Sequence, residues 1–347
     1  MGLLNEIFTR LRSFLIYHSM LFINYILLIC FLQSIPVDFE VFASLVSSYI
    51  LTGIAAFLVN DYYDKKVDLK AGKSNLTEKV NSYSIGFLVL LGFSVSFLLV
   101  NRISQNAGIV LLVQFASLFA YSHPRVRLKT KPIFGVIADS IYAYIIPVLL
   151  LFVVYKIDIR EVEYLAFLLF NFSIGIRDIL LHQKADEAND LKSGISSFAI
   201  RHKTKIYSII STSEYTASFS LFLFFTLALM KQASQNYMLG VAVAYMVLLF
   251  FQIVKIRKAV GSNYMMRFYV VLSSFIIFYW LLNENEFSSL ILLIHPYFIQ
   301  FFIELIIRFK NIVGVIVNYS LYYSFKLIGR DLKTKPLYKR DEKKSSK

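Results

Sequence analysis

The chain has 347 residues, of which 57% are hydrophobic and only 17% are charged, and its mean hydropathy is +0.62. Soluble domains average roughly 45–50% apolar and about 25% charged residues, so this composition excludes an ordinary soluble fold and indicates an integral membrane protein. The net charge of +14 fits the excess of Lys and Arg that membrane proteins carry in cytoplasmic loops, and we expect no nucleic-acid partner.

The apolar residues fall into blocks of about 20, the length that a helix needs to cross a bilayer. Most blocks are apolar on all sides, as helices in lipid are. We predict an all-α, polytopic transmembrane helical bundle. Its nine transmembrane helices are expected at about 13–34, 41–59, 83–100, 107–122, 133–155, 162–181, 206–230, 236–254 and 268–283. A tenth apolar run, at about 287–308, contains Pro296 and Glu304 and is expected to cross, re-enter or lie along the membrane surface.

Lys and Arg gather in alternate connections. They are frequent before the first segment and after the second, fourth, sixth and eighth, and rare in the connections between. By the positive-inside rule, the N-terminus and the basic connections are cytoplasmic. We therefore predict a multi-pass protein of the cell (inner or plasma) membrane. Residues 1–286 form the transmembrane domain, and 287–347 add the tenth run and a basic, partly disordered tail.

The first polar cluster, NDYYDKKVD, stands where the second segment meets the cytoplasm. Its Asn60, Asp61, Asp64 and Asp68 follow the pattern N-D-x-x-D-x-x-x-D. Spacings of three and four place residues on one face of a helix. Asp61, Asp64 and Asp68 are therefore predicted to line one stripe, with Asn60 beside it.

The second polar cluster, RDILLHQKADEANDLKSG, follows the sixth segment. Asp186 and Asp190 are four residues apart, and His182 and Asp178 extend the same helical stripe by one turn each. A single aspartate in a cytoplasmic loop is usually an ordinary solvated charge. Two spaced sets at helix ends favour a functional site instead.

Carboxylates this close repel one another unless cations lie between them. Mg²⁺ takes oxygen ligands and is typically held by one or two carboxylates together with substrate phosphates, so the two clusters could clamp Mg²⁺ around a diphosphate. Positive side chains nearby are candidate contacts to its oxygens. They are Lys73, Arg127, Lys129 and Lys184. The spacing of a calcium EF-hand, a Cys/His set for zinc, a P-loop and a G-x-G-x-x-G pattern are all lacking from the sequence.

Three blocks resemble the UbiA superfamily of intramembrane prenyltransferases. NDYYDKKVDLKAGKSN looks like its first aspartate-rich motif, and HQKADEANDLKSGISSFA is similar to its second, D-x-x-x-D motif. YSHPRVRLKTKPIFG, from Tyr121 to Gly135, resembles the Tyr-Ser and basic segment between the fourth and fifth helices of the family. The three blocks occur in the family's order.

The resemblance implies a nine-helix bundle around a central cavity, with 1–286 as the prenyltransferase-like domain. It also implies Mg²⁺-dependent binding of an isoprenyl diphosphate, ionisation of the allylic C–O bond and capture of the cation by a hydrophobic or aromatic acceptor. The implied catalytic residues are Asp61, Asp64, Asp68, Asp186 and Asp190. The implied metal ligands are Asn60, Asp64, Asp68, Asp186 and Asp190. The implied diphosphate-binding residues are Asn60, Lys73, Arg127, Lys129 and Lys184, with Tyr121 near the reacting carbon.

The chain departs from the family pattern in two places. His182 stands where many members carry an aspartate, and the first segment lacks the Arg-Pro start common in relatives that act on aromatic acids. The acceptor therefore stays open among an aromatic acid, a quinone precursor, a lipid headgroup and a porphyrin. A membrane terpene cyclase, which ionises the same substrate without an acceptor, is the close alternative. A transporter is less supported, because transporters place their charges near the membrane midplane.

Overall fold

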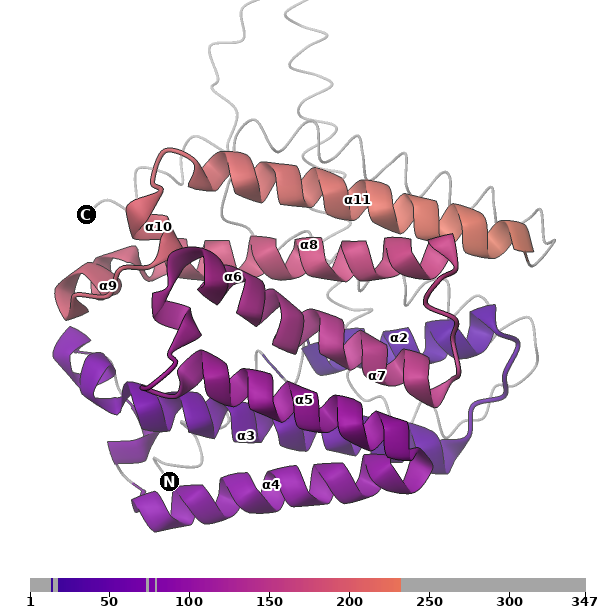
Figure 1. Ribbon diagram of the computed structural model, residues 1–347, viewed down its shortest axis with the longest axis horizontal. Coiled ribbons are helices and arrows are strands. Elements are labelled where there is room, and N and C mark those ends of the chain that lie inside the picture. Colours follow the sequence, from indigo (N-terminus) through magenta and orange to yellow (C-terminus); the bar gives the residue numbers. More distant parts are fainter. Residues whose placement is uncertain (1–13, 15–17, 73–74, 79, 232–347) are drawn as a thin grey trace, which may run out of the picture. The chain divides into compact units, whose positions relative to one another are not determined.

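The computed structural model describes residues 14, 18–72, 75–78 and 80–231. These residues form helices and turns without any strand, which confirms the all-α prediction for this part of the chain. The helices are α2 (Ser19–Leu32), α3 (Phe39–Ala71), α4 (Ser82–Ile103), α5 (Gln105–Ser122), α6 (Pro132–Ser140), α7 (Ile146–Val154), α8 (Val162–Ala185), α9 (Glu187–Ser193), α10 (Phe198–Arg201) and α11 (Ile206–Lys231) (Figure 1). The short turns are η2 (Leu76–Glu78), η3 (Leu128–Thr130) and η4 (Ile141–Ile145).

Four of the described segments are long and apolar enough to cross a membrane. They are Phe39–Ala71, Ser82–Ile103, Pro132–Val154 and Val162–Ala185. The predicted helices at 236–254 and 268–283, the run at 287–308 and the domain boundary at 286 lie outside the described residues, so the number nine stays a prediction.

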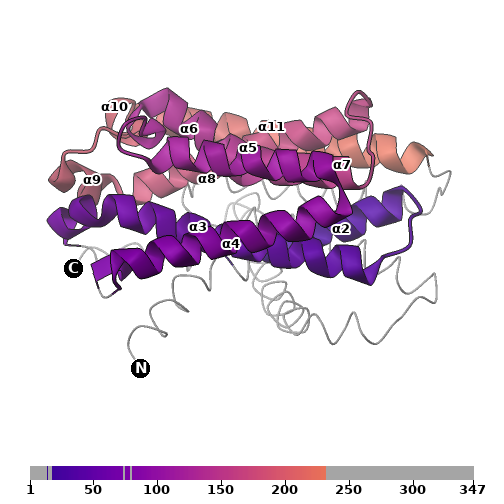
Figure 2. The ribbon, with the colours of Figure 1, turned by 60° about the horizontal axis from the view of Figure 1, so that its bottom comes forward.

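Two groups of helices are linked through the middle of the described bundle. α8 and α11 pack along each other on one side, and α3 and α4 do so on the other. α5 contacts both α4 and α7, and α6 contacts α8, which connects the two groups. Figure 2 shows the same grouping from a second direction. Large apolar side chains on the outer side of α4, including Phe87, Leu90 and Leu98, are exposed, as lipid-facing side chains are.

α3 is longer than the apolar block predicted at 41–59. Asp38 caps its start by accepting from Val41 N–H at 3.1 Å, and Gly72 ends it with a left-handed φ of 74°. Its 33 residues correspond to about 50 Å, whereas the hydrocarbon core of a bilayer is about 30 Å thick. The last turns of α3, which carry the first aspartate cluster, therefore extend beyond the length that lipid requires.

The fifth predicted segment is interrupted by the π-helical turn η4. Ile146 N–H donates to Ile141 C=O, an i to i+5 bond. The next such bond would need an N–H at Pro147, which proline lacks. The carbonyl of Tyr142 accepts instead from Gln114 Nε2 of α5, at 3.0 Å. A proline and a neighbouring helix thus stabilise the irregular turn that carries Tyr142 and Tyr144.

α8 approaches this turn closely through a glycine. A Cβ at Gly175 would lie 2.8 Å from Ser140 Cα and 3.0 Å from a ring carbon of Tyr144. Small residues let helix backbones come together in membrane bundles. On the other side of the bundle, the hydroxyls of Ser48 and Ser96 each donate to the other's carbonyl, at 3.3 and 3.1 Å, and so join α3 to α4.

Candidate active site

Both aspartate clusters lie at the same end of the described bundle. The short helix α9, which carries Asp190, contacts α3, which carries the first cluster. The loop between α5 and α6 reaches the same end (Figure 1). Helix packing thus brings together three segments that are far apart in the sequence.

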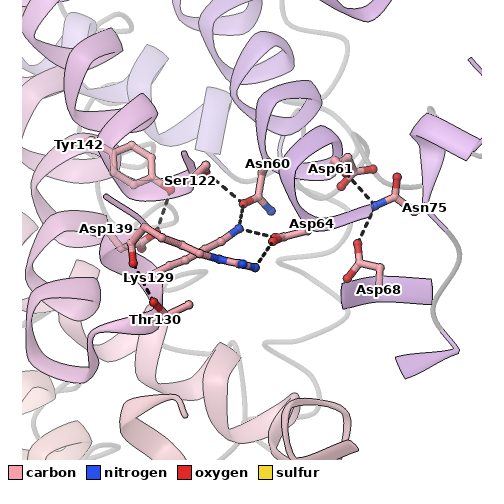
Figure 3. Close-up of polar contacts among 11 residues, drawn as sticks. Asn60, Asp61, Asp64, Asp68, Asn75, Ser122, Lys129, Thr130, Asp139 and Tyr142 are labelled. Atoms are coloured by element: carbon pink, nitrogen blue, oxygen red, sulfur yellow. Dashed lines mark hydrogen bonds and ion pairs between the residues drawn. The ribbon is translucent and has the colours of Figure 1, made fainter. Parts of the chain in front are cut away.

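Asn60 and Asp64 face the basic loop between α5 and α6. Lys129 Nζ donates to Asn60 Oδ1 at 2.9 Å and to Asp64 Oδ2 at 2.5 Å. Arg127 Nη2 reaches Asp64 Oδ1 at 3.3 Å, and Ser122 Oγ donates to Asn60 Oδ1 at 3.3 Å. Figure 3 shows these contacts converging on one side of α3. The structure therefore brings four of the sequence-predicted residues into one polar cluster.

An unusual backbone conformation presents the two basic side chains. Arg127 has a φ of +40°, in the left-handed region that costs a non-glycine residue roughly 1–2 kcal/mol. Such residues cluster at functional sites, where the surrounding contacts hold them. Arg127 Nε is buried and has no hydrogen-bond partner among the described residues. The guanidinium therefore has one N–H whose hydrogen-bonding capacity the described residues do not use.

Two opposing effects act on the pKa of the Lys129 ammonium. Burial lowers the pKa of Lys129 from its ordinary value, and the charge of Asp64 opposes this effect. Only 13% of the Lys129 side chain is exposed. Burial thus disfavours the ammonium form of Lys129, and the Asp64 carboxylate favours it.

Asp61 and Asp68 have different partners from Asn60 and Asp64. Asn75 Nδ2 donates to the Asp61 carbonyl at 2.9 Å and to Asp68 Oδ2 at 2.7 Å, and Leu76 N–H donates to Asp61 Oδ2 at 3.4 Å. Figure 3 shows the two contacts of Asn75 on the side of α3 away from Lys129. The residues of the predicted stripe on α3 therefore contact two different segments: the basic loop and the segment that contains Asn75. Their roles in catalysis and metal binding stay predictions.

The second cluster straddles a break between helices. α8 ends at Ala185, Asp186 adopts φ −88° and ψ 0°, and α9 begins at Glu187. The Asp190 N–H still donates to the Asp186 carbonyl at 2.9 Å, so the two aspartates keep the helical spacing across the break. Both side chains are half-buried, whereas His182, one turn earlier, is exposed.

Two of the predicted diphosphate contacts are not placed in this cluster. Lys184 pairs with Glu187 and lies 5.6 Å from the centre of the Tyr207 ring. Glu187 also binds Lys203, at 2.7 Å. Lys184 thus contacts α9 and α11 in the structure, and its role toward a diphosphate stays a prediction. Lys73 lies outside the described residues.

Tyr121 lies in the last turn of α5, beside a second tyrosine. Its ring lies 5.2 Å from that of Tyr142, whose hydroxyl donates to Asp139 Oδ1 at 2.9 Å. The position of Tyr121 relative to a reacting carbon stays a prediction.

The sequence analysis missed a buried ionic network beneath the site. Arg177 is 1% exposed, and it binds Asp178 Oδ1 at 2.5 Å and Glu214 Oε1 at 2.8 Å. Tyr144 donates to the other Asp178 oxygen at 2.9 Å. The signal that could have identified the network is a charged residue inside an apolar segment, because such residues in membrane helices face partners within the bundle.

Asp139 and Asn75 were also missed, for different reasons. Asp139 is an isolated carboxylate within the apolar segment predicted at 133–155, so the same signal would have found it. Asn75 follows the first cluster in the chain but belongs to no recurring spacing with it. Only the fold of the segment after α3 brings its amide to Asp68.

The donor atoms in this region fit a hard divalent cation. In the part of the chain that the structure describes, no group of three or more His, Cys, Asp or Glu side chains forms a ready metal cage. Mg²⁺ needs no such cage, because one or two carboxylates together with substrate phosphates and waters usually hold it. Asp64 and Asp68 on α3, and Asp186 and Asp190 at α9, are the described carboxylates that could contribute.

The chain matches the UbiA prenyltransferase family over residues 21–282. It is similar in structure to a UbiA homologue from Archaeoglobus fulgidus bound to DMAPP and Mg²⁺, with a TM-score of 0.57 and 13% identity over 76% of this chain and 96% of the homologue. The same homologue bound to GPP and Mg²⁺ gives a TM-score of 0.56 and 14% identity over the same shares. The apo UbiA homologue from Aeropyrum pernix K1 gives a TM-score of 0.58 and 13% identity over 78% of this chain and 98% of the homologue. No curated protein sequence matches the chain.

Proposed function

Because the chain belongs to the UbiA prenyltransferase family, we propose that it transfers an isoprenyl group from an isoprenyl diphosphate to an acceptor within the membrane, in a Mg²⁺-dependent reaction. The observation that carries the proposal is the convergence of the two aspartate clusters and the basic loop at one end of the bundle. The structural relatives bound to DMAPP or GPP with Mg²⁺ support the choice of substrate class and cation.

The diphosphate end of the substrate is proposed to bind at the polar cluster. Bound Mg²⁺ would neutralise the charge that develops on the diphosphate as the C–O bond breaks. We assign its ligands to Asn60, Asp64, Asp68, Asp186 and Asp190. Arg127 and Lys129 bind Asp64 in the structure, and we propose that they also donate to diphosphate oxygens.

The hydrocarbon end is proposed to extend between the helices from Tyr121. Loss of the diphosphate leaves an allylic cation, and aromatic faces stabilise cationic charge. Tyr121 and Tyr142 lie side by side next to the polar cluster, and their hydroxyls are directed to Asp139. A nucleophilic atom of the acceptor then bonds to the cationic carbon and its proton leaves. The acceptor itself stays open, as does the chain length of the isoprenyl group.

The charge pattern of the connections supports a cytoplasmic site. The basic loop that contains Arg127 and Lys129 joins the fourth and fifth predicted segments, and the positive-inside rule places that loop in the cytoplasm. We therefore propose that the diphosphate is bound from the cytoplasm while its tail lies at membrane depth.

The test compares two aspartate variants with a matched control. Asp64→Ala and Asp190→Ala should each lower diphosphate release from geranyl diphosphate by at least ~100-fold, the order seen when a charge-stabilising group is removed. Asp158→Ala is the control, since Asp158 pairs with exposed Arg160 in the loop before α8 and should turn over normally.

Purified protein would be assayed with Mg²⁺, with and without phenolic, quinone-precursor and lipid acceptors. Undiminished release in either cluster variant would contradict the proposal. A cyclic hydrocarbon formed without any acceptor would identify the chain as a membrane terpene cyclase instead.

A further inference from the structure

Asn75 lies in the short segment that follows α3 and is only 1% exposed. Its Nδ2 donates to the Asp61 carbonyl at 2.9 Å and to Asp68 Oδ2 at 2.7 Å. Its Oδ1 accepts from the backbone N–H of Thr77 at 3.0 Å and from the Thr77 hydroxyl at 2.6 Å. A carboxamide has two donor hydrogens and an oxygen with two lone pairs, so these four contacts use its full capacity.

The same segment is attached to α3 by further contacts. Leu76 N–H donates to Asp61 Oδ2, and Lys65 Nζ donates to the Thr77 carbonyl at 3.0 Å. Asp61 is buried, and both its carbonyl and its Oδ2 accept hydrogen bonds from this segment. We call Asp61, Asp68, Asn75 and Leu76 the Asn75 clasp, of which Figure 3 shows Asp61, Asp68 and Asn75.

We propose that Asn75 is a positioning residue for the metal site, and that its amide orients the Asp68 carboxylate toward the cation. The inference rests on the proposed function, in which Asp68 is a metal ligand. Ligating carboxylates are themselves hydrogen-bonded, and these outer partners set their orientation. In this arrangement Asp61 holds the Asn75 segment to α3 and so supports the position of Asp68.

The neutral amide of Asn75 acts differently on its carboxylate from the cationic side chains of the basic loop. Asp64 is bound by two cations, Arg127 and Lys129, which compete with a metal for the same negative charge. Asn75 is a neutral donor, so it fixes one oxygen of Asp68 without neutralising the carboxylate. The structure thus shows two cations bound to Asp64 and an amide donor bound to Asp68.

The test measures ligand binding and not only turnover. Geranyl thiodiphosphate, an analogue that resists ionisation, would be titrated calorimetrically into the full-length protein at a series of Mg²⁺ concentrations. Asn75→Ala should raise the Mg²⁺ concentration for half-maximal binding by about 10–100-fold, the usual effect of losing an outer partner of a metal ligand. Analogue affinity should recover at saturating Mg²⁺, whereas a misfolded variant would not recover.

Two comparisons separate positioning from general destabilisation. Asn81→Ala removes a nearby asparagine that caps α4 through the Tyr83 N–H at 3.0 Å and should leave the Mg²⁺ dependence unchanged. In an Asp68→Asn background, Asn75→Ala should cause little further change, because the two residues act as a unit.

Each outcome decides a different claim. If wild-type protein binds the analogue and Asn75→Ala needs no more Mg²⁺ than Asn81→Ala, the clasp has no positioning role and the proposed function stands. An undiminished effect of Asn75→Ala in the Asp68→Asn background would also overturn the positioning role. If wild-type protein binds no thiodiphosphate analogue, whether dimethylallyl, geranyl or longer, at any Mg²⁺ concentration, the proposed function fails, and the inference with it.

Discussion

Lys129 donates hydrogen bonds to Asn60 and Asp64, the two residues of the first cluster that face the basic loop. It is the second residue after Arg127, whose left-handed backbone turns the loop toward α3. Two residues further on, Lys131 is exposed and its backbone caps α6. The chain therefore offers two lysines in one loop, one inside the candidate site and one outside it.

Replacing Lys129 with Gln should lower the turnover of geranyl diphosphate by roughly 100- to 1,000-fold, the order reported for removing one preorganised donor to a developing anion. Lys131→Gln should stay close to wild type. Steady-state diphosphate release at saturating Mg²⁺ measures both. Equal activities in the two variants would show that the contact of Lys129 with Asp64 is not used in the reaction.

At the residue scale, spacing identified the positions but not their partners. The N-D-x-x-D-x-x-x-D pattern picks out the four residues on α3, because helical periodicity is a local property. The division into Asn60 and Asp64 on one side and Asp61 and Asp68 on the other depends on Lys129 and Asn75. Those contacts arise only when separate segments pack together, so spacing could not predict them.

The approach of α8 to the π-helical turn η4 depends on the absence of a side chain at Gly175. Gly175→Ala would place a Cβ 2.8 Å from Ser140 Cα, and backbone cannot yield as a flexible side chain can. Overpacking of this kind typically costs about 1–3 kcal/mol. We expect a loss of that order in the free energy of unfolding in mixed micelles.

Gly86 on α4 provides the matched control, since an added Cβ there meets nothing within 4 Å. Gly86→Ala should be neutral or stabilising by up to about 1 kcal/mol, because alanine is the better helix former. Two variants of equal stability would mean that α8 and η4 are less closely packed than the structure shows.

α8 and α11 are joined by Arg177, which binds Asp178 on its own helix and Glu214 on the other. Arg177→Met would leave two carboxylates without their cation, and breaking a buried pair from one side typically costs about 3–5 kcal/mol. Arg201→Met, at an exposed arginine on α10, should change stability by no more than about 0.5 kcal/mol. Unfolding in mixed micelles measures both, and similar stabilities would contradict the proposed importance of the network.

At the element scale, hydropathy predicted the helix bounds well for helices that are apolar along most of their length. The segment predicted at 162–181 is α8 (Val162–Ala185), and that at 206–230 is α11 (Ile206–Lys231). α3 exceeded its prediction because the helix continues through polar residues to the glycine cap at Gly72. The turn η4 could not be predicted, because it depends on Pro147 together with a side chain from another helix, Gln114.

At the scale of the whole molecule, orientation in the membrane follows from charge and is open to a direct test. Cys30 is the only cysteine of the chain and is fully buried, so single cysteines can be introduced after it is replaced by alanine. Lys131 and Arg160 flank the span Pro132–Val154 and are both exposed.

In intact cells, Arg160→Cys should react with a membrane-impermeant maleimide, and Lys131→Cys should react only after permeabilisation. This is expected because the positive-inside rule predicts that the basic loop lies in the cytoplasm. The opposite pattern would reverse the proposed orientation. Reaction of both cysteines from one side would show that the segment between them does not cross.

The pairing of Asp64 with Arg127 and Lys129 has a consequence for how salt affects ligand binding. The chain supplies its own counter-ions to this carboxylate, so Asp64 is already paired before any ligand arrives. Binding of a diphosphate with its divalent cations would exchange these close ion contacts for others. Dissolved salt mainly screens attraction between separated, exposed charges. The exchange of contacts at Asp64 should therefore add little to the salt dependence of binding, unlike an open basic surface which attracts phosphates from a distance.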